Sequence, residues 1–315
     1  MTGENIKASS KTLDIVIPVY NDAPYLEESL NSIYNQQLTD GWQAHIYVVD
    51  DGSDKPIKVD IPNDKAHRLS VIRLDENSGC GVARNKGAFA GNGEVILFLD
   101  ADCSFAHENV LSLLLEQYEE GFDVCFGQIY APQGDFWAKY QNDVAKERAI
   151  RFWSGEKSSM TTGVFMVKRQ VFNSVDGFDE AYHFGFEDRD LFIRLINSGA
   201  KVSLVESALV NHNDQISLNS VTRKLYQSGE KLSMKFIEEH PGEYIMMGYA
   251  RADVRFSKGG LKLLVFLSKP FLWPMIKLLD GVLKKEKLAF FIAKKLMKFA
   301  TGLAYLHGTA AARKS

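Results

Sequence analysis

The fold is decided by residues 94–103, with the sequence EVILFLDADC, in which five apolar residues end abruptly in Asp100 and Asp102. A short unbroken apolar run after a glycine-containing turn predicts a strand that is buried on both faces, as in parallel sheets. Ligands of open α/β sheets bind beyond the carboxyl ends of the strands, so both acids are expected at the functional edge. Two carboxylates at this spacing suit a hard divalent cation such as Mg²⁺ or Mn²⁺, although acids here can also simply cap the next helix.

Two more predicted strands lie upstream and enclose a helical segment. Residues 13–21 are a β-branched run interrupted by proline, residues 21–37 carry apolar side chains at helical spacing, and residues 45–49 form the second strand. This order of strand, helix and strand predicts an α/β fold. The second strand ends in Asp50 and Asp51, which are either ordinary turn residues or carboxylates that accept hydrogen bonds from a nucleotide.

A glycine-rich segment follows the next predicted strand, residues 69–74. Gly79 and Gly81 partly match a dinucleotide fingerprint, but Arg84 occupies the third glycine position and the motif does not open the first β-α-β unit. An NAD site is therefore rejected. A helix that starts near Gly81 would place Arg84 near its N-terminus, where a diphosphate binds favourably. The alternative is a surface arginine on a solvated helix.

The rest of the α/β region supplies two more groups of candidate site residues. Glu187 and Asp188 precede an apolar helical face, although acids in a first turn commonly just complement the helix dipole. His212 follows a short strand; a lone histidine is usually a surface or core residue, but opposite Asp102 it becomes a candidate metal ligand. The expected elements are a helix at 109–118, strands at 123–129, 161–167, 201–205 and 208–210, and an irregular segment at 131–160.

Composition describes a folded chain with unevenly distributed charge. The 315 residues are 45% hydrophobic with a net charge of −3, but residues 251–315 hold fourteen Lys and Arg against three Asp and Glu, which is +11 and leaves −14 for residues 1–250. The three cysteines lack zinc-binding or disulfide-rich spacing, which indicates a reducing, cytoplasmic compartment. The polar start shows no signal segment, so a flexible N-terminus at 1–11 is expected before an α/β domain at 12–250.

Residues 251–315 are predicted to form basic amphipathic helices rich in Leu, Phe and Lys. Their apolar stretches are too short, or too interrupted by lysine, to cross a bilayer. Such helices suit the interface of an anionic leaflet, so we expect peripheral association with the inner face of the cell membrane. The alternative is that they pack on the α/β domain with a solvated basic face. Nucleic acid is a poor partner because the rest of the chain is acidic.

Six motifs in this sequence resemble, in order and rough spacing, those of the family 2 inverting glycosyltransferases, over about residues 12–213. The resemblance implies a GT-A fold, which is a Rossmann-like mixed sheet flanked by helices, here with a C-terminal helical appendage. It also implies a nucleotide-diphospho-sugar donor and a Mn²⁺ or Mg²⁺ cofactor. The motifs are IPVYN at 17–21, VDDGS at 49–53, Asn77 and Gly79 with ARNKG at 83–87, LDAD at 99–102, GFDE at 177–180, and Glu187-Asp188.

The resemblance also implies roles for individual residues. Asp102 would bind the metal. His212 lies outside the matched motifs and is the candidate second ligand because of its place at a strand end. Glu187 would contact the donor sugar or the acceptor, and Asp188 would be the general base. Donor-binding roles fall on residues that would line the base (Pro18, Tyr20, Asp51), support the nucleotide (Asp50, Arg84) and meet the ribose (Asp100).

The expected function is metal-dependent, inverting transfer of a hexose from a UDP-sugar to a hydroxyl of a lipid-linked or cell-surface glycan or glycolipid precursor. A single transfer is expected because the Gln-x-x-Arg-Trp motif and the multiple spanning helices of processive synthases are not evident. Thr161-Thr162-Gly163 departs from the small residues of many relatives, which leaves the acceptor side open. The competing interpretation is a catalytically silent sugar-nucleotide-binding or scaffold protein on the same fold; the intact Asp102, Glu187 and Asp188 favour an enzyme.

Overall fold

The computed structural model describes residues 11–21, 23–59, 68–131, 134–156, 160–183, 185–213, 216–257 and 260–312. The expected flexible N-terminus therefore lies almost entirely outside the described residues. The chain forms two compact units. The first comprises Met1–Tyr130, Val144–His183 and Leu191–Asp214, and the second comprises Ala131–Asp143, Phe184–Asp190 and Gln215–Ser315.

The first unit is built on an eight-stranded mixed sheet with the strand order β3-β2-β1-β4-β7-β6-β8-β5. Strands β3, β2, β1 and β4 are mutually parallel, β7 runs antiparallel to β4 and β6, β6 pairs parallel with β8, and β5 pairs antiparallel with β8. The strands are β1 Lys11–Val19, β2 Trp42–Asp50, β3 Leu69–Arg73, β4 Val95–Leu99, β5 Cys103–Phe105, β6 Val124–Tyr130, β7 Val164–Lys168 and β8 Val202–His212.

Strand β4 is the centre of this sheet, as its sequence predicts. All five of its residues are fully buried. Because side chains alternate along a strand, Val95, Leu97 and Leu99 enter one hydrophobic core while Ile96 and Phe98 enter the other. A strand covered on both faces needs an unbroken apolar run, which is what residues 95–99 supply.

Helices cover both faces of the sheet in the first unit. One core contains Leu26 and Leu30 of α1 together with Leu111 and Leu114 of α3, and the other contains Ala83 and Ala88 of α2. The helices that lie wholly in this unit are α1 Ala23–Tyr34, α2 Cys80–Ala90, α3 Val110–Glu119 and α5 Arg169–Ser174. The chain also contains α4 Phe136–Trp153 and α6 Glu187–Asn197, each of which contributes residues to both units.

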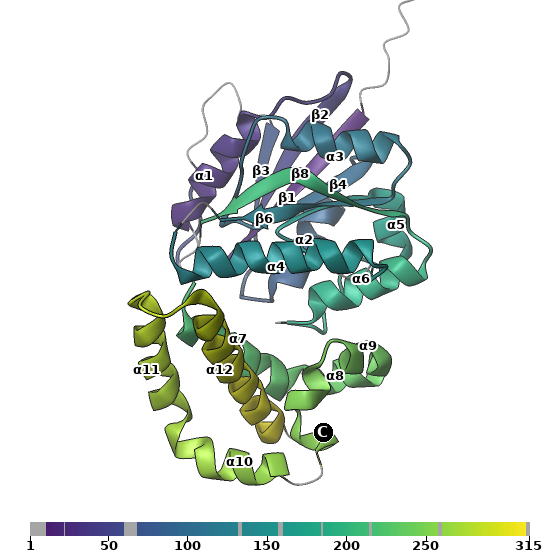
Figure 1. Cartoon of the computed structure of the whole chain (residues 1–315). Coiled ribbons are helices and arrows are strands. Elements are labelled where there is room, and N and C mark those ends of the chain that lie inside the picture. Colours follow the sequence, from purple (N-terminus) through teal and green to yellow (C-terminus); the bar gives the residue numbers. More distant parts are fainter. Residues whose placement is uncertain are drawn as a thin grey trace, which may run out of the picture. The chain divides into compact units, whose positions relative to one another are not determined.

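The second unit is helical, with α7, α11 and α12 side by side (Figure 1). Helices α7 and α12 approach so closely that a Cβ on Gly308 would lie 2.1 Å from the Tyr226 carbonyl oxygen, so only glycine fits there. Leu218, Ile276 and Met297 belong to its core. Its elements are α7 Leu218–Lys231, α8 Ser233–Glu239, α9 Pro241–Met246, η2 Tyr249–Ala252, η3 Val254–Phe256, α10 Gly260–Ser268, η4 Lys269–Phe271, α11 Leu272–Lys284 and α12 Phe290–Ala311.

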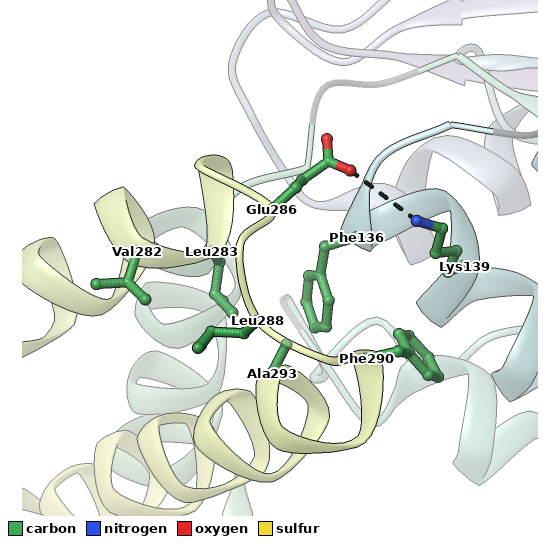
Figure 2. Close-up of a pocket in the computed structure, with 8 residues that line it drawn as sticks. All are labelled: Phe136, Lys139, Val282, Leu283, Glu286, Leu288, Phe290 and Ala293. Carbon is green, nitrogen blue, oxygen red and sulfur yellow. Dashed lines mark ion pairs between the residues drawn. The ribbon is translucent and has the colours of Figure 1, made fainter.

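A small pocket of about 50 Å³ lies within the second unit, between the start of α4 and the segment joining α11 to α12 (Figure 2). Phe136, Leu283 and Phe290 are among the side chains that line it, and Lys139 Nζ lies 3.9 Å from Glu286 Oε2 beside it. Sites for small molecules usually enclose several hundred Å³, so this pocket is too small for a nucleotide sugar.

Two expectations about the elements are wrong, and one short strand was missed. The segment expected to be irregular, residues 131–160, contains the eighteen-residue helix α4. Its apolar side chains do not form one stripe, because Phe136 packs in the second unit and Phe152 in the first. The two short strands expected at 201–210 are one strand, β8, with an irregular register, and the short strand β5 was not expected.

The expected domain boundary at residue 250 also differs from the observed division. Residues 215–250 belong with the C-terminal helices, because α7 packs along α12 and the buried Tyr244 hydroxyl lies 2.7 Å from that of Tyr305. Among the described helices, none combines the length and the apolar character that crossing a bilayer requires.

Candidate active site

Asp51 joins two loops at the carboxyl edge of the sheet. Its carboxylate is almost fully buried and accepts hydrogen bonds from the backbone N–H groups of Ser78 at 2.8 Å and Gly79 at 3.0 Å. Gly79 has φ +98°, and a Cβ there would lie 2.4 Å from the His183 carbonyl oxygen, so the loop requires glycine. Burial raises the pKa of Asp51 above its ordinary value, while the two backbone hydrogen bonds oppose that shift.

Asp50 holds the loop that carries Asp51. One carboxylate oxygen accepts the Ser53 N–H at 2.9 Å, and the other accepts the Ile57 N–H at 3.1 Å and a hydrogen bond from Arg73. Burial opposes ionisation of Asp50, but these hydrogen bonds together hold its pKa below the ordinary value. All of these contacts are to the protein's own loop and to Arg73, and the role expected for Asp50 in supporting the nucleotide stays a prediction.

Pro18 and Tyr20 lie at the same edge as Asp51. Pro18 pairs with Val49 in the parallel register of β1 and β2, and Tyr20 follows the end of β1 with 42% of its surface exposed. The Asp51 N–H donates to the Val19 carbonyl oxygen at 2.8 Å, which fixes the two strand ends side by side. An exposed aromatic ring beside a carboxylate can stack on a base while the carboxylate accepts hydrogen bonds from it.

Arg84 and Asp100, which the sequence treats separately, form one ion pair. Arg84 Nη2 lies 2.7 Å from Asp100 Oδ1, and the guanidinium carbon lies 5.4 Å from the centre of the Phe178 ring. Phe178 is held by Asn85, whose amide accepts from its N–H at 2.9 Å and donates to its carbonyl oxygen at 2.8 Å. Arg84 is buried, whereas the Asp100 side chain is partly exposed, so Asp100 is the member that faces solvent.

Asp102 and His212 come together although 110 positions separate them in the sequence. Strands β5 and β8 pair Cys103 directly opposite His212, and the Asn213 N–H donates to the Asp102 carbonyl oxygen at 2.8 Å. His212 Nε2 consequently lies 3.4 Å from Asp102 Oδ2. The proximity that the sequence analysis required for a shared metal ion is therefore present.

The donor set at this point fits a divalent cation. Asp102, Cys103 and His212 form a group whose potential ligand atoms all lie within 4.8 Å of one another. Neighbouring ligands of an ion bound at about 2.1 Å are themselves about 3 Å apart, close to the observed separation of the carboxylate and the imidazole. Burial, together with Asp100 and Asp102, raises the pKa of the Cys103 thiol well above its ordinary value, which disfavours thiolate ligation.

Glu187 and Asp188 open helix α6, and both are half-buried. Asp188 Oδ1 accepts the N–H of Arg189 at 2.7 Å. The first backbone N–H groups of a helix have no acceptor within the helix and carry partial positive charge, so the first turn stabilises negative charge on these carboxylates. Both residues belong to the second unit.

The turn that carries Glu187 and Asp188 is attached to helix α8 and to the residue that follows that helix. The Phe186 ring stacks on Phe236 at a centroid distance of 4.5 Å, and the buried Asp190 carboxylate lies 2.8 Å from His240 Nε2. Phe186 and Asp190 are four positions apart in the sequence, and so are their partners Phe236 and His240. Sequence reasoning missed this attachment, and nothing in the local pattern around His240 distinguishes it from an ordinary helix end.

Asp190, Glu239 and His240 form a second group of potential metal ligands. His240 already contacts Asp190, and Lys235 forms an ion pair with Glu239, which places a positive charge beside the group. These ion pairs within the protein account for the closeness of Asp190, Glu239 and His240.

A mixed sheet whose parallel strands end in carboxylates, with a buried arginine on helix α2 and an Asp-His pair at the same edge, is the arrangement of a GT-A fold. The family model described as "Glycosyl transferase family 2" matches residues 14–176, just over half of the chain, and the protein belongs to this family. A second model, described as the N-terminal domain of galactosyltransferase, matches residues 148–215. The predicted family and fold class are confirmed.

Curated relatives are similar over part of their length. A pre-mycofactocin glycosyltransferase of Mycobacterium tuberculosis is 27% identical over 229 residues, which cover 70% of this chain and 47% of the relative. The glycosyltransferase GlyG of Streptococcus pneumoniae is 28% identical over 183 residues, which cover 53% of this chain and 60% of the relative. An N-acetylglucosaminyltransferase of Rhizobium sp. is 26% identical over a stretch that covers 63% of this chain and 47% of the relative. The chain thus spans about half the length of these relatives.

Two solved structures share the fold. The mannosyltransferase PcManGT of Pyrobaculum calidifontis, in complex with GDP-Man and Mn²⁺, superposes with a TM-score of 0.53 at 16% identity, covering 95% of this chain and 85% of that one. GalNAc-T7 with UDP, GalNAc and Mn²⁺ superposes with a TM-score of 0.50 at 19% identity, covering 65% of this chain and 43% of that one. At this level of identity the similarity establishes the GT-A architecture.

Proposed function

We propose that the protein is a metal-dependent inverting glycosyltransferase that moves a single hexosyl group from a UDP-sugar to a hydroxyl acceptor. The observation that carries the proposal is the approach of His212 Nε2 to Asp102 Oδ2, 3.4 Å, at the sheet edge where Asp51 and Asp100 also lie. Binding a nucleotide-diphospho-sugar requires ligands for a cation, a carboxylate that contacts the nucleobase and a carboxylate that contacts the ribose. Asp102 with His212, Asp51 and Asp100 are assigned to these three tasks.

Donor binding is assigned to the carboxyl edge of the sheet. Tyr20 and Pro18 would line the base, with Asp51 accepting its N–H groups through lone pairs that the Ser78 and Gly79 hydrogen bonds leave open. The partly exposed Asp100 would accept hydrogen bonds from ribose hydroxyls, and its ion pair with Arg84 would fix its orientation.

Asp102 and His212 would hold Mn²⁺ or Mg²⁺, which when bound supplies a positive charge that stabilises the departing diphosphate. Asp188 is assigned as the general base. As the acceptor oxygen bonds to C1 of the sugar, its proton passes to the Asp188 carboxylate, while the C1–O bond to the diphosphate breaks on the opposite face. That single displacement inverts the configuration at C1. Glu187 is assigned to contacts with the donor sugar or the acceptor.

The acceptor is proposed to be a lipid-linked or cell-surface glycan or glycolipid precursor, reached from the inner face of the cell membrane. The +11 charge of residues 251–315 supports this proposal, because an anionic leaflet attracts a basic helical segment. An enzyme held at that surface would meet an acceptor anchored in the same surface.

The proposal is tested by incubating the full chain with UDP-, GDP- and dTDP-sugars and Mn²⁺ and measuring donor hydrolysis. Activity with one UDP-sugar, lost on chelation and in Asp102→Asn, is the expected result. Preference for GDP or dTDP would overturn the UDP assignment. Binding of a nucleotide sugar without turnover of any donor would favour the silent binding protein instead.

A further inference from the structure

We propose that helix α10 and the following turn η4 form the surface through which the protein enters an anionic lipid leaflet. The term α10 surface is used here for Leu263, Leu264, Phe266, Leu267 and Phe271. This inference rests on the membrane association in the proposed function and adds the element that inserts and the class of lipid that it meets.

The α10 surface consists of large apolar side chains that remain in solvent. Phe266 is 75% exposed, Phe271 66%, Leu263 60%, Leu267 59% and Leu264 42%. No residue of α10 is buried. By contrast, the neighbouring helix α11 buries four residues and α12 buries ten. Scattered single apolar residues on a surface are ordinary, but five within nine consecutive positions mark an interaction site.

The helix nevertheless has a fixed orientation within its unit. Leu261 and Val265, one turn apart, are partly buried against the hydrophobic core of the second unit. Leu263, Phe266 and Leu267 are spaced three and four residues apart and therefore share the opposite face. The exposed apolar face thus follows from the way α10 packs, and nothing else among the described residues of this unit buries it.

Charge decides which occupant fits the α10 surface. Lys262 and Lys269 are exposed beside it, and residues 260–279 contain three lysines and no acidic residue. Lysines that flank an apolar face can place their methylene groups in the interface while their ammonium groups meet lipid phosphates. A second copy of the chain docked about a two-fold axis would instead bring like charges together. The occupant is therefore an anionic bilayer surface.

Helix α12 provides a matched comparison within the same unit. Phe299 is also an exposed aromatic residue, at 56%, with Lys295 and Lys298 nearby on the same helix. Its neighbours Met297 and Ala300 are buried, so the helix packs firmly and its apolar exposure is less continuous. If the basic tail bound lipid without a specific insertion element, Phe299 would matter as much as Phe266.

The test floats the full chain with vesicles of phosphatidylcholine alone or mixed with phosphatidylglycerol. The wild type is expected to float with the anionic vesicles, more strongly at low salt. Phe266→Ser and Leu267→Ser should each lower the association constant about tenfold or more, since each loses the burial of a large apolar side chain. Phe299→Ser should leave it unchanged. Lys262→Gln and Lys269→Gln should each lower it about fivefold on anionic vesicles only.

Three results would overturn the inference. The first is a wild-type chain that floats with neither kind of vesicle, and the second is an equal loss of vesicle association in Phe299→Ser and Phe266→Ser. The third is a dimer in sedimentation that Phe266→Ser dissociates, which would assign the surface to a second copy. Donor hydrolysis in vesicle-free buffer is measured on the same proteins and should be unchanged in the α10 variants. Its absence from the wild type would count against the proposed enzyme activity and would leave the flotation result to decide the lipid surface on its own.

Discussion

Replacing Asp50 by asparagine should destabilise the first unit through the loop that carries Asp51. Asparagine keeps the shape of aspartate, and its carbonyl oxygen can still accept the Ser53 N–H at 2.9 Å. Its amide NH₂ would then face two donors, the Ile57 N–H and the Arg73 guanidinium. The substitution therefore removes two hydrogen bonds and the negative charge from a carboxylate that is 1% exposed.

The expected loss in the free energy of unfolding is about 2–4 kcal/mol. A hydrogen bond to a charged group contributes about 1.5–3 kcal/mol, which applies to the part-buried hydrogen bond from the Ile57 N–H. The Arg73 side chain is 38% exposed, so its ion pair adds no more than about 1 kcal/mol after solvent screening. With a urea dependence of about 3 kcal/mol per molar for a unit of this size, the unfolding midpoint should fall by about 1 M.

The assay must follow the first unit alone, because a chain of two units can unfold in more than one step. Hydrogen exchange of peptides from β1 and β2 across a urea series provides that measurement. Asp75→Asn is the matched control, since Asp75 is exposed and follows the next strand, and it should change the free energy by no more than about 0.5 kcal/mol. Equal midpoints for the two variants would refute the account of Asp50.

The stabilisation by Asp50 should also depend on pH. Its pKa is lowered in the folded protein, so the contribution is fully present above the unfolded value of about 3.9 and is lost as the pH falls through the lower folded value. The difference between the wild type and Asp50→Asn should therefore shrink on acidification below about pH 4. A difference that grows as the pH falls would show that the carboxylate is not the stabilising species.

Three further predictions address the site and its support. Asp102→Asn should abolish Mn²⁺-dependent donor hydrolysis and weaken Mn²⁺ binding in a direct titration, and full activity in chelator-treated buffer would disprove the metal assignment. Asp188→Asn should lower kcat for transfer about 10²–10⁴-fold with donor affinity unchanged, and wild-type turnover would place the base elsewhere. His240→Ala should destabilise the start of α6 by about 1–3 kcal/mol, because it removes the 2.8 Å contact with buried Asp190. His240→Gln should restore part of that stability in an exchange experiment on α6 peptides.

The sequence by itself determined the central strand and its chemistry. Residues 95–99 are apolar without interruption and follow a glycine-containing turn, a pattern typical of a short strand covered on both faces, so Asp100 and Asp102 were expected at a strand end. The six ordered motifs were enough to identify the family, because their order along the chain is a property of sequence alone. The charge difference between residues 1–250 and 251–315 was likewise readable without a structure.

Only the tertiary structure decided which distant residues meet. The pairing of Asp102 with His212 depends on β5, a three-residue strand too short to show periodicity, whose register with β8 sets Cys103 opposite His212. The ion pair between Arg84 and Asp100 depends in the same way on how α2 packs beside β4, which no local pattern encodes.

The tertiary structure also decided the division of the chain. Helix α4 was missed because its apolar residues serve two cores, Phe136 in the second unit and Phe152 in the first, and no single stripe results. Phe184–Asp190, with both proposed catalytic acids, joins the C-terminal helices through the contacts of Phe186 and Asp190 with α8 and His240. Such contacts join segments about fifty residues apart, and only packing, which depends on the whole chain, selects them.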